Sequence, residues 1–254
     1  MTHIDLTNLP LISFVSLLIA LFAAGSTKGL LGIGMPIVAV PLLNLIVDLR
    51  TTVILLAIPL IITNVPQAIQ GDRIPVVLRR LWPILAGMVV GVAIGVTLLS
   101  LSNPAHLKPV VGIILLAVCA LMWFAPKLTV PPYLERFASP VAGLVGGLAG
   151  GLAALPGPFV FVYLLALGLK RDQFVQYSSM FLVISAAVMT AFLHGQGLMG
   201  WKDAIISTLA TLPIFAGMWA GAFVRNYVSQ ELFRKLILVV VAVSGSQMLM
   251  VFIR

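Results

Sequence analysis

Apolar runs fill almost the whole chain, and their length limits what it can fold into. Of the 254 residues, 61% are hydrophobic and only 9% are charged, whereas soluble domains carry about 25% charged residues. A helix that crosses a bilayer needs about 20 predominantly apolar residues. The sequence therefore predicts an all-α polytopic membrane protein surrounded by lipid. No large polar block remains, so we expect a single integral membrane domain over residues 1–254.

Ten apolar segments are candidates for crossing the membrane. They lie near 11–28, 33–47, 51–70, 81–101, 107–125, 139–155, 157–169, 174–193, 204–224 and 234–253. Two of them, 33–47 and 157–169, cover only about 22 and 20 Å of a hydrocarbon core of about 30 Å. Each of these two is predicted to be a partial helix or one arm of a re-entrant hairpin, which gives eight to ten segments in total.

Basic residues are distributed unevenly between the two faces that alternating segments define. One face collects Lys28, Arg73, Arg79, Arg80, Lys127, Arg136, Lys170, Arg171, Arg225, Arg234 and Lys235, and the other collects Arg50, Lys108, Lys202 and Arg254. The richer face is predicted to be cytoplasmic, with both termini on the extracytoplasmic side of a bacterial inner membrane. This bias and anionic lipid explain the net charge of +8, so no nucleic-acid partner is needed.

The two halves of the chain resemble each other. "GLLGIGMPIVAVPLL" from Gly29 matches "GLAALPGPFVFVYLL" from Gly151 at seven of fifteen positions, and "PILAGMVVG" from Pro83 matches "PIFAGMWAG" from Pro213 at six of nine. Each half, approximately 11–126 and 137–254, holds five segments. Because five is odd, the second copy must enter the membrane from the opposite side. Such inverted-topology repeats are typical of secondary transporters, which bind substrate near the midplane where broken helices meet.

The stretch "GSTKGLLGIGMP" is expected to break the first helix, because glycine and proline weaken helix propensity. Freed backbone N–H groups at such a break can bind an anion. We therefore predict that substrate binds here, through the residues Ser26, Thr27, Lys28, Gly32 and Gly34. The alternative is that the small residues serve helix packing and that Lys28 is an ordinary cytoplasmic loop residue.

The second copy, "GGLAGGLAALPGP", keeps the break at Pro156 and Gly157 but carries no charge or hydroxyl group. A site built from both breaks would therefore be asymmetric, with its cation supplied by the first half. We include Pro156 and Gly157 among the predicted substrate-binding residues.

Polar residues also interrupt the third segment. Thr63, Gln67 and Gln70 are spaced to share one helical face, and Asn64 lies beside them. The stripe should face protein or a transport pathway rather than lipid. Asn64, Gln67 and Gln70 are therefore candidate substrate-binding residues, although hydrogen bonding between helices would explain them equally well.

His194 follows the corresponding segment of the second half, where "HGQ" stands in place of "QGD". It is a candidate for binding substrate or carrying a proton, or simply a hydrated residue at a helix end. The three histidines are far apart in sequence and Cys119 is the single cysteine. No metal site and no cofactor is predicted.

Every carboxylate is expected at or between segment ends rather than at mid-membrane. Asp48, Asp72, Glu135, Asp172, Asp203 and Glu231 fall there, and Asp5 precedes the first segment. Fixed negative charge for a metal cation is therefore missing, and the predicted substrate is a small anion. The coupling ion, and whether the chain forms a homo-oligomer, stay open.

The motif Gly29 to Pro41, its second glycine-rich copy and the chain length resemble those of the sulfite exporter TauE/SafE family of membrane permeases. The resemblance implies transport of small anions such as sulfite, organosulfonates, other sulfur compounds or carboxylates. The chain departs from the family's usual glycine run at Met35 and Pro36. An anion channel and a membrane-embedded enzyme are the alternatives, but neither a nucleophile with its base nor a nucleotide-binding motif is visible. We therefore expect a transporter and not an enzyme.

Overall fold

A computed structural model describes residues 10–124, 131–224, 239 and 246. The described residues form helices and no strand. The helices are α1 (Leu11–Leu31), α2 (Met35–Leu43), α3 (Leu49–Ala68), α4 (Ile74–Leu101), α5 (Pro104–Phe124), α6 (Pro132–Ala153), α7 (Gly157–Ala166), α8 (Arg171–Gly195), α9 (Trp201–Leu209) and α10 (Thr211–Val224). The predicted segment 234–253 lies outside the described residues, apart from two isolated helical positions.

Within the described residues, five helical stretches are long and apolar enough to cross a membrane: α1, α3, α4, α8 from Asp172, and α9 together with α10. By contrast, α2 has nine residues and α7 has ten, about 14 and 15 Å of helix. The prediction of a partial helix at each of these two places is therefore confirmed. The chain is an all-helical, multi-pass membrane protein.

Several helices begin before the apolar segments that predicted them. α4 begins at Ile74 and α6 at Pro132 rather than at 81 and 139. The apolar pattern marks only the part of each helix that contacts lipid. The helical backbone hydrogen bonds also include the polar turn that precedes this apolar part. In that turn Arg80 of α4 forms an ion pair with Glu135 of α6, with 3.6 Å between nitrogen and oxygen.

The predicted segment 204–224 is two helices, α9 and α10, separated at Ala210. Ser207 of α9 donates to the carbonyl of Leu55 in α3 at 3.1 Å. That carbonyl is free because Pro59, four residues later, has no N–H to donate. The hydroxyl of Ser207 thus supplies the hydrogen bond that Pro59 cannot donate within α3.

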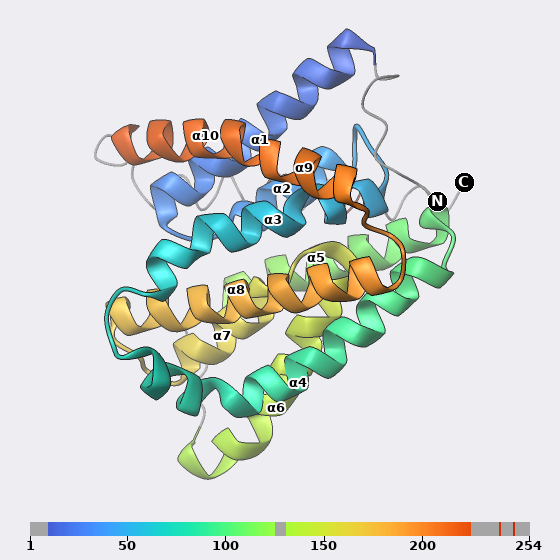
Figure 1. The fold of residues 1–254 in the computed structure, drawn as a ribbon. Coiled ribbons are helices and arrows are strands. Elements are labelled where there is room, and N and C mark those ends of the chain that lie inside the picture. The colour runs from blue at the N-terminus through green and yellow to red at the C-terminus, as the bar shows by residue number, and fades with distance from the viewer. Residues whose placement is uncertain (1–9, 125–130, 225–238, 240–245, 247–254) are drawn as a thin grey trace.

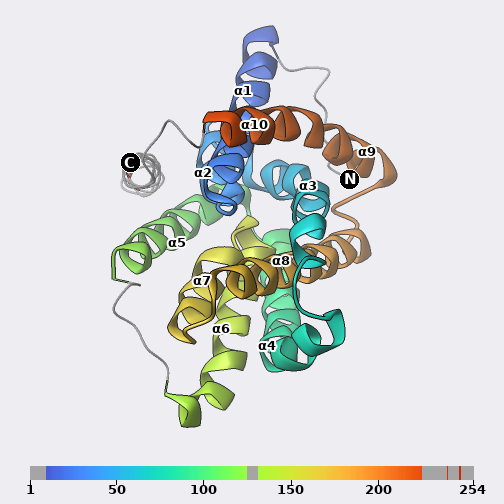
Figure 2. The same cartoon turned by 90° about the vertical axis from the view of Figure 1, so that its left-hand side faces the viewer.

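The helices are arranged in layers (Figures 1 and 2). Both views place α1 and α10 together on one side and α4 and α6 together on the other, with α3 and α8 between these two pairs. Each outer pair joins a helix of the first half to one of the second half. The two halves are therefore intertwined rather than side by side.

Glycine faces allow both outer pairs to pack backbone against backbone. A Cβ atom added at Gly25 or Gly29 of α1 would come closer than 3.0 Å to the backbone of α10, and one added at Gly143 or Gly147 of α6 would do the same to α4. Small residues at such faces are the usual basis of close helix association in membranes.

Contacts between helices also give the relative directions of α1, α3, α4, α6, α8 and α10. α1 runs parallel to α3 and to α10, and α4 runs parallel to α6 and to α8. α3 and α8 are antiparallel, since Gln67 meets Ser179 whereas Asp72 meets Gln176. Helices that the sequence aligns between the halves, α1 with α6, α3 with α8 and α4 with α10, therefore run in opposite directions. An inverted repeat requires this arrangement, and the repeat itself stays a prediction.

The chain reverses at the first helix break. Because Gly32, at the end of α1, contacts Gln67, near the end of the parallel α3, residues 33–48 must return to the start of α3. That return covers about 27 Å, the length of α3 before Gln67. α2 supplies only half of the distance, so residues 33–48 form a half-helix followed by an irregular connection.

Candidate functional site

Lys28 is buried in the last turns of α1, with 3% of its surface exposed. Its amino group donates to Thr63 Oγ1 at 3.3 Å and to Asn64 Oδ1. The interpretation of Lys28 as a cytoplasmic loop residue is therefore wrong. Lys28 is a buried basic residue within a helix long enough to cross a membrane, a kind of residue that in membrane proteins usually marks a functional site.

Thr63 and Asn64 are fixed by bonds to their own helix. The hydroxyl of Thr63 donates to the carbonyl of Pro59 at 2.7 Å, and the amide nitrogen of Asn64 donates to the carbonyl of Leu60 at 2.7 Å. With their donors used in this way, both side chains present an oxygen to Lys28. The amino group is thus held by two neutral acceptors.

Gln67 lies one turn further along α3 and joins three helices. Its Nε2 donates to the carbonyl of Gly32 at 3.1 Å, and its Oε1 accepts from the hydroxyl of Ser179 in α8 at 3.2 Å. Gly32 has φ +80° and ends α1 in the left-handed conformation that glycine adopts readily. The side chain of Gln67 therefore connects the first helix break to α8.

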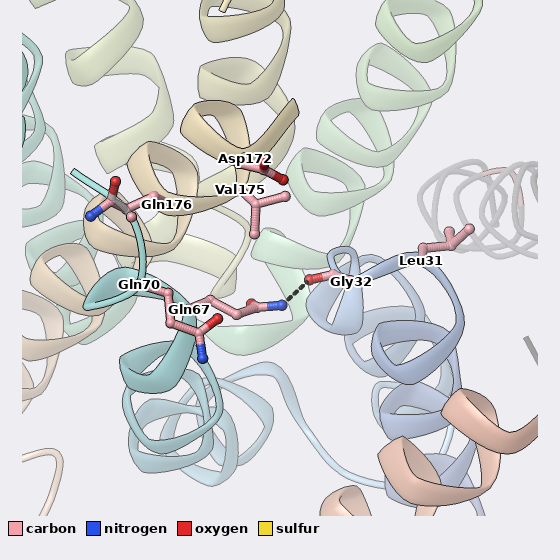
Figure 3. Close-up of a pocket in the computed structure, with 8 residues that line it drawn as sticks. Leu31, Gly32, Gln67, Gln70, Asp172, Val175 and Gln176 are labelled. Atoms are coloured by element: carbon pink, nitrogen blue, oxygen red, sulfur yellow. Dashed lines mark hydrogen bonds between the residues drawn. The ribbon is translucent and has the colours of Figure 1, made fainter. Parts of the chain in front are cut away.

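A pocket of about 550 Å³ opens next to this bridge (Figure 3). It is lined by Leu31, Gly32, Gln67, Gln70, Gly71, Asp172, Val175 and Gln176. Lys28 is not among these residues: it lies four residues before Gly32, about 6 Å deeper along α1. Asp172, whose side chain is exposed, also lines the pocket.

A second set of bonds holds the pocket wall together. The side-chain amide of Gln176 accepts from the N–H of Asp72 at 2.8 Å and donates to the carbonyl of Asp72 at 2.8 Å. The carboxylate of Asp72 accepts from Gln173 at 3.2 Å and from Tyr177 at 3.4 Å. The turn between α3 and α4 is thereby fixed to the first turns of α8.

The second helix break is apolar and lies outside this pocket. Ala154 ends α6 with φ +55°, and Pro156 precedes α7. Both Pro156 and Gly157 are buried, and Pro156 packs against Gly150 of α6. The hydroxyl of Ser185 in α8, near the same glycine, is buried with no hydrogen-bond partner. The structure confirms the predicted break, but it does not bring Pro156 and Gly157 to the pocket that Gly32 lines.

Of the other predicted substrate-binding residues, Gln70 lines the pocket, whereas Ser26, Thr27 and Gly34 are not among its lining residues. The hydroxyl of Ser26 donates to the carbonyl of Phe22, and its backbone packs against α10. Thr27 is buried next to Gly34, which precedes α2 with φ +96°. Gly34 and Thr27 therefore shape the break, whereas Ser26 faces the helix interface.

His194 lies apart from this group. It is exposed at the far end of α8, about 27 Å from Gln176 along the helix, and its Nδ1 lies 3.1 Å from the carbonyl oxygen of Met199. A second pocket of about 520 Å³ opens at that end, lined by Ala191, Phe192, Gly195 and Gln196.

Sequence reasoning missed the contribution of α8 to the first pocket. Gln173, Gln176 and Ser179 recur every three residues at the start of an otherwise apolar segment, the same kind of polar stripe that was noticed in α3. That signal could have found them. Their pairing with Asp72 and Gln67 depends on the antiparallel contact of α3 with α8, which the sequence pattern does not show.

Together the fold and the buried lysine define a polytopic membrane protein with a polar pocket beside its first helix break. Comparison with known families gives the finer assignment: the model of the Sulfite exporter TauE/SafE family matches residues 17–248, nearly the whole chain. The chain belongs to this family of membrane permeases. Neither the curated proteins nor the solved structures contain a match to it.

Proposed function

We propose that this protein is a secondary transporter that moves small anions, such as sulfite, organosulfonates or other sulfur-containing or carboxylate anions, by alternating access. Its family membership supports transport of an anion. The single observation that carries the proposed site is Lys28, a buried lysine whose partners are neutral oxygens and which lies one turn of α1 from the pocket-lining Gly32. An anion beside the protonated amine of Lys28 would interact with a full positive charge in a medium where charge interactions are strong.

Gln67 is the proposed gate between the pocket and Lys28. Its bonds to Gly32 and Ser179 connect α1, α3 and α8 beside the pocket, and we infer that they close the route from the pocket to Lys28. Two neutral hydrogen bonds contribute only about 0.5–1.5 kcal/mol each, so they can be broken during a transport cycle. An anion arriving through the pocket would take over the amide donor of Gln67 before reaching the amino group.

The two pockets support alternating access between inverted halves. One is lined by Gln70 and Gly71 at the end of α3, and the other by Gly195 and Gln196 at the end of α8. These are matching places in the two sequence copies, and they lie at opposite ends of the antiparallel pair α3 and α8. We infer that each pocket leads to the shared site from one side of the membrane.

The remaining features of the proposal concern placement in the cell. We propose one membrane domain over residues 1–254, with the pocket of Gln67 on the cytoplasmic side of an inner membrane and both termini outside. The basic residues Arg73, Arg79, Arg80 and Lys170 all belong to the ends of α4 and α8 near that pocket, which supports this orientation through the positive-inside rule.

Counterflow in proteoliposomes tests the proposal. Vesicles preloaded with unlabelled sulfite, methanesulfonate, thiosulfate or acetate would take up the same labelled anion if a carrier exchanges it. Lys28→Met should lower the exchange at least about 30-fold, because losing one buried charge contact costs about 2–5 kcal/mol. The control is Lys202→Met, which removes an exposed lysine and should exchange normally. Flux without counterflow would indicate a channel, and no flux of any anion would refute the transport proposal.

A further inference from the structure

The amino group of Lys28 has no negative partner in the described structure. Its two acceptors, Thr63 Oγ1 and Asn64 Oδ1, are uncharged. Among the described residues, Arg80 and Glu135 form an ion pair within 4.0 Å, whereas Lys28 forms none. Most buried charges in proteins are paired, so a lysine surrounded by neutral oxygens needs an explanation.

The helices packed around Lys28 supply no other charge at its level. α1 holds no second titratable residue, and α2 and α10 hold none. α3 contributes Arg50, but at the opposite end, where its guanidinium donates to the carbonyls of Leu99, Ser100 and Ser102. The described carboxylates near the pocket are Asp72, which accepts from Gln173 and Tyr177, and Asp172, which lines the pocket together with Gln67.

In this environment, the protonation of Lys28 depends on whether an anion is bound beside its nitrogen. Burying a lone ammonium group away from water costs far more free energy than burying a neutral amine that is hydrogen-bonded. An anion beside the nitrogen offsets the cost of the charge, so an anion favours the protonated amine and a proton favours the bound anion. Such coupling between two ligands is reciprocal by thermodynamic necessity.

We propose that Lys28 carries the coupling proton, so that one proton crosses the membrane with each anion. This inference rests on the proposed function of anion transport. The neutral amine of Lys28 uses its lone pair to bind a proton from solution as the anion enters, which gives an ammonium group paired with the anion. On the other side the anion leaves, the N–H bond breaks, the proton goes to water and the neutral amine returns. For a monovalent anion the loaded site carries no net charge.

The test uses the purified full chain in proteoliposomes with labelled methanesulfonate, which stays ionised and cannot carry the proton itself. With the membrane potential clamped at zero, an acid exterior should drive accumulation, about tenfold per pH unit at equilibrium. A pH-sensitive dye trapped inside should report one proton per anion. Accumulation driven by the potential alone, or net uptake of methanesulfonate without proton uptake, would overturn this inference and leave the transport proposal intact. Absence of counterflow for every anion tried would overturn both.

Two variants separate proton coupling from anion binding. Lys28→Arg keeps a charge that cannot be lost, so it should retain counterflow but lose accumulation driven by the pH gradient. Asn64→Asp places a carboxylate beside Lys28 with little change of shape, so the lysine should stay protonated without an anion. That variant should bind methanesulfonate more weakly and also lose the pH-driven accumulation. If both variants folded, exchanged anion and still accumulated it in response to pH, Lys28 would not be the proton carrier.

Discussion

The break between α1 and α2 is surrounded by polar side chains, whereas the break between α6 and α7 is packed by apolar ones. At the first, Gln67 binds the carbonyl of Gly32 and Lys28 lies one turn away. At the second, Ala154 and Pro156 are buried against Gly150, with one unpartnered hydroxyl at Ser185. Two related sequences thus give similar backbone breaks with different chemistry. The comparison shows that a shared backbone break does not by itself decide whether polar or apolar side chains surround it.

What the two regions share is the close packing of the helix before each break, and here we expect the largest change in stability. Gly25→Ala in α1 and Gly147→Ala in α6 would each push a methyl group into the backbone of α10 or α4. Each should lower the free energy of unfolding by about 1–3 kcal/mol, measured by denaturant titration in mixed micelles.

The matched control for this pair is Gly195→Ala, because nothing lies within 4 Å of the added methyl group. It should be neutral or stabilising by up to about 1 kcal/mol, since alanine favours helix. If Gly25→Ala and Gly147→Ala differed strongly from each other, the two outer helix pairs would not be equivalent.

The residues that end the two helices should respond to substitution with opposite signs. Gly32 has φ +80° with room for a methyl group, since the nearest atom, Gln67 Nε2, would be 3.9 Å away. Gly32→Ala should therefore destabilise by about 1–2 kcal/mol through backbone conformation alone. Ala154 already has φ +55°, a conformation that glycine adopts with less strain than alanine. Because glycine also raises the entropy of the unfolded chain, Ala154→Gly should raise the free energy of unfolding by only about 0.5–1 kcal/mol.

Thermal unfolding of both purified variants checks these signs. The same sign for both would mean that one of the two left-handed residues relaxes in the membrane. Equal transport by Gly32→Ala and the unmodified chain would further show that the Gly32 carbonyl keeps its bond to Gln67.

The smallest expected effect compares two serines of α8, one beside each break. Ser179→Ala removes the donor to Gln67 Oε1 and should cost about 1 kcal/mol. Ser185→Ala removes a buried hydroxyl that has no partner, so stability should be unchanged or rise by about 1 kcal/mol. Unfolding in mixed micelles measures both, and a larger loss at Ser185 than at Ser179 would show that the second break also holds a bound polar group.

Part of the site could be predicted locally. The glycines and prolines around Gly32 and Pro156 predict both breaks, and the polar stripe of α3 predicts that Asn64, Gln67 and Gln70 face protein or a pathway. Whether Lys28 was a loop residue or an intramembrane cation could not be decided in this way, because both are compatible with a lysine near the end of an apolar segment. His194 was grouped with the site by its matching position, although matching positions of oppositely directed helices lie at opposite ends.

The amino-acid sequence by itself determined that the chain is helical and membrane-bound, where its helices break, and that its polar side chains avoid lipid, because hydrophobicity and backbone propensity are local properties. The tertiary structure decided which polar groups meet. Lys28 reaches Thr63 and Asn64, and Gln67 reaches Ser179, because glycine faces let α1 pack on α10 and α6 on α4 around the antiparallel pair α3 and α8. Those contacts join residues more than 30 positions apart, and only the packing of whole helices brings them together.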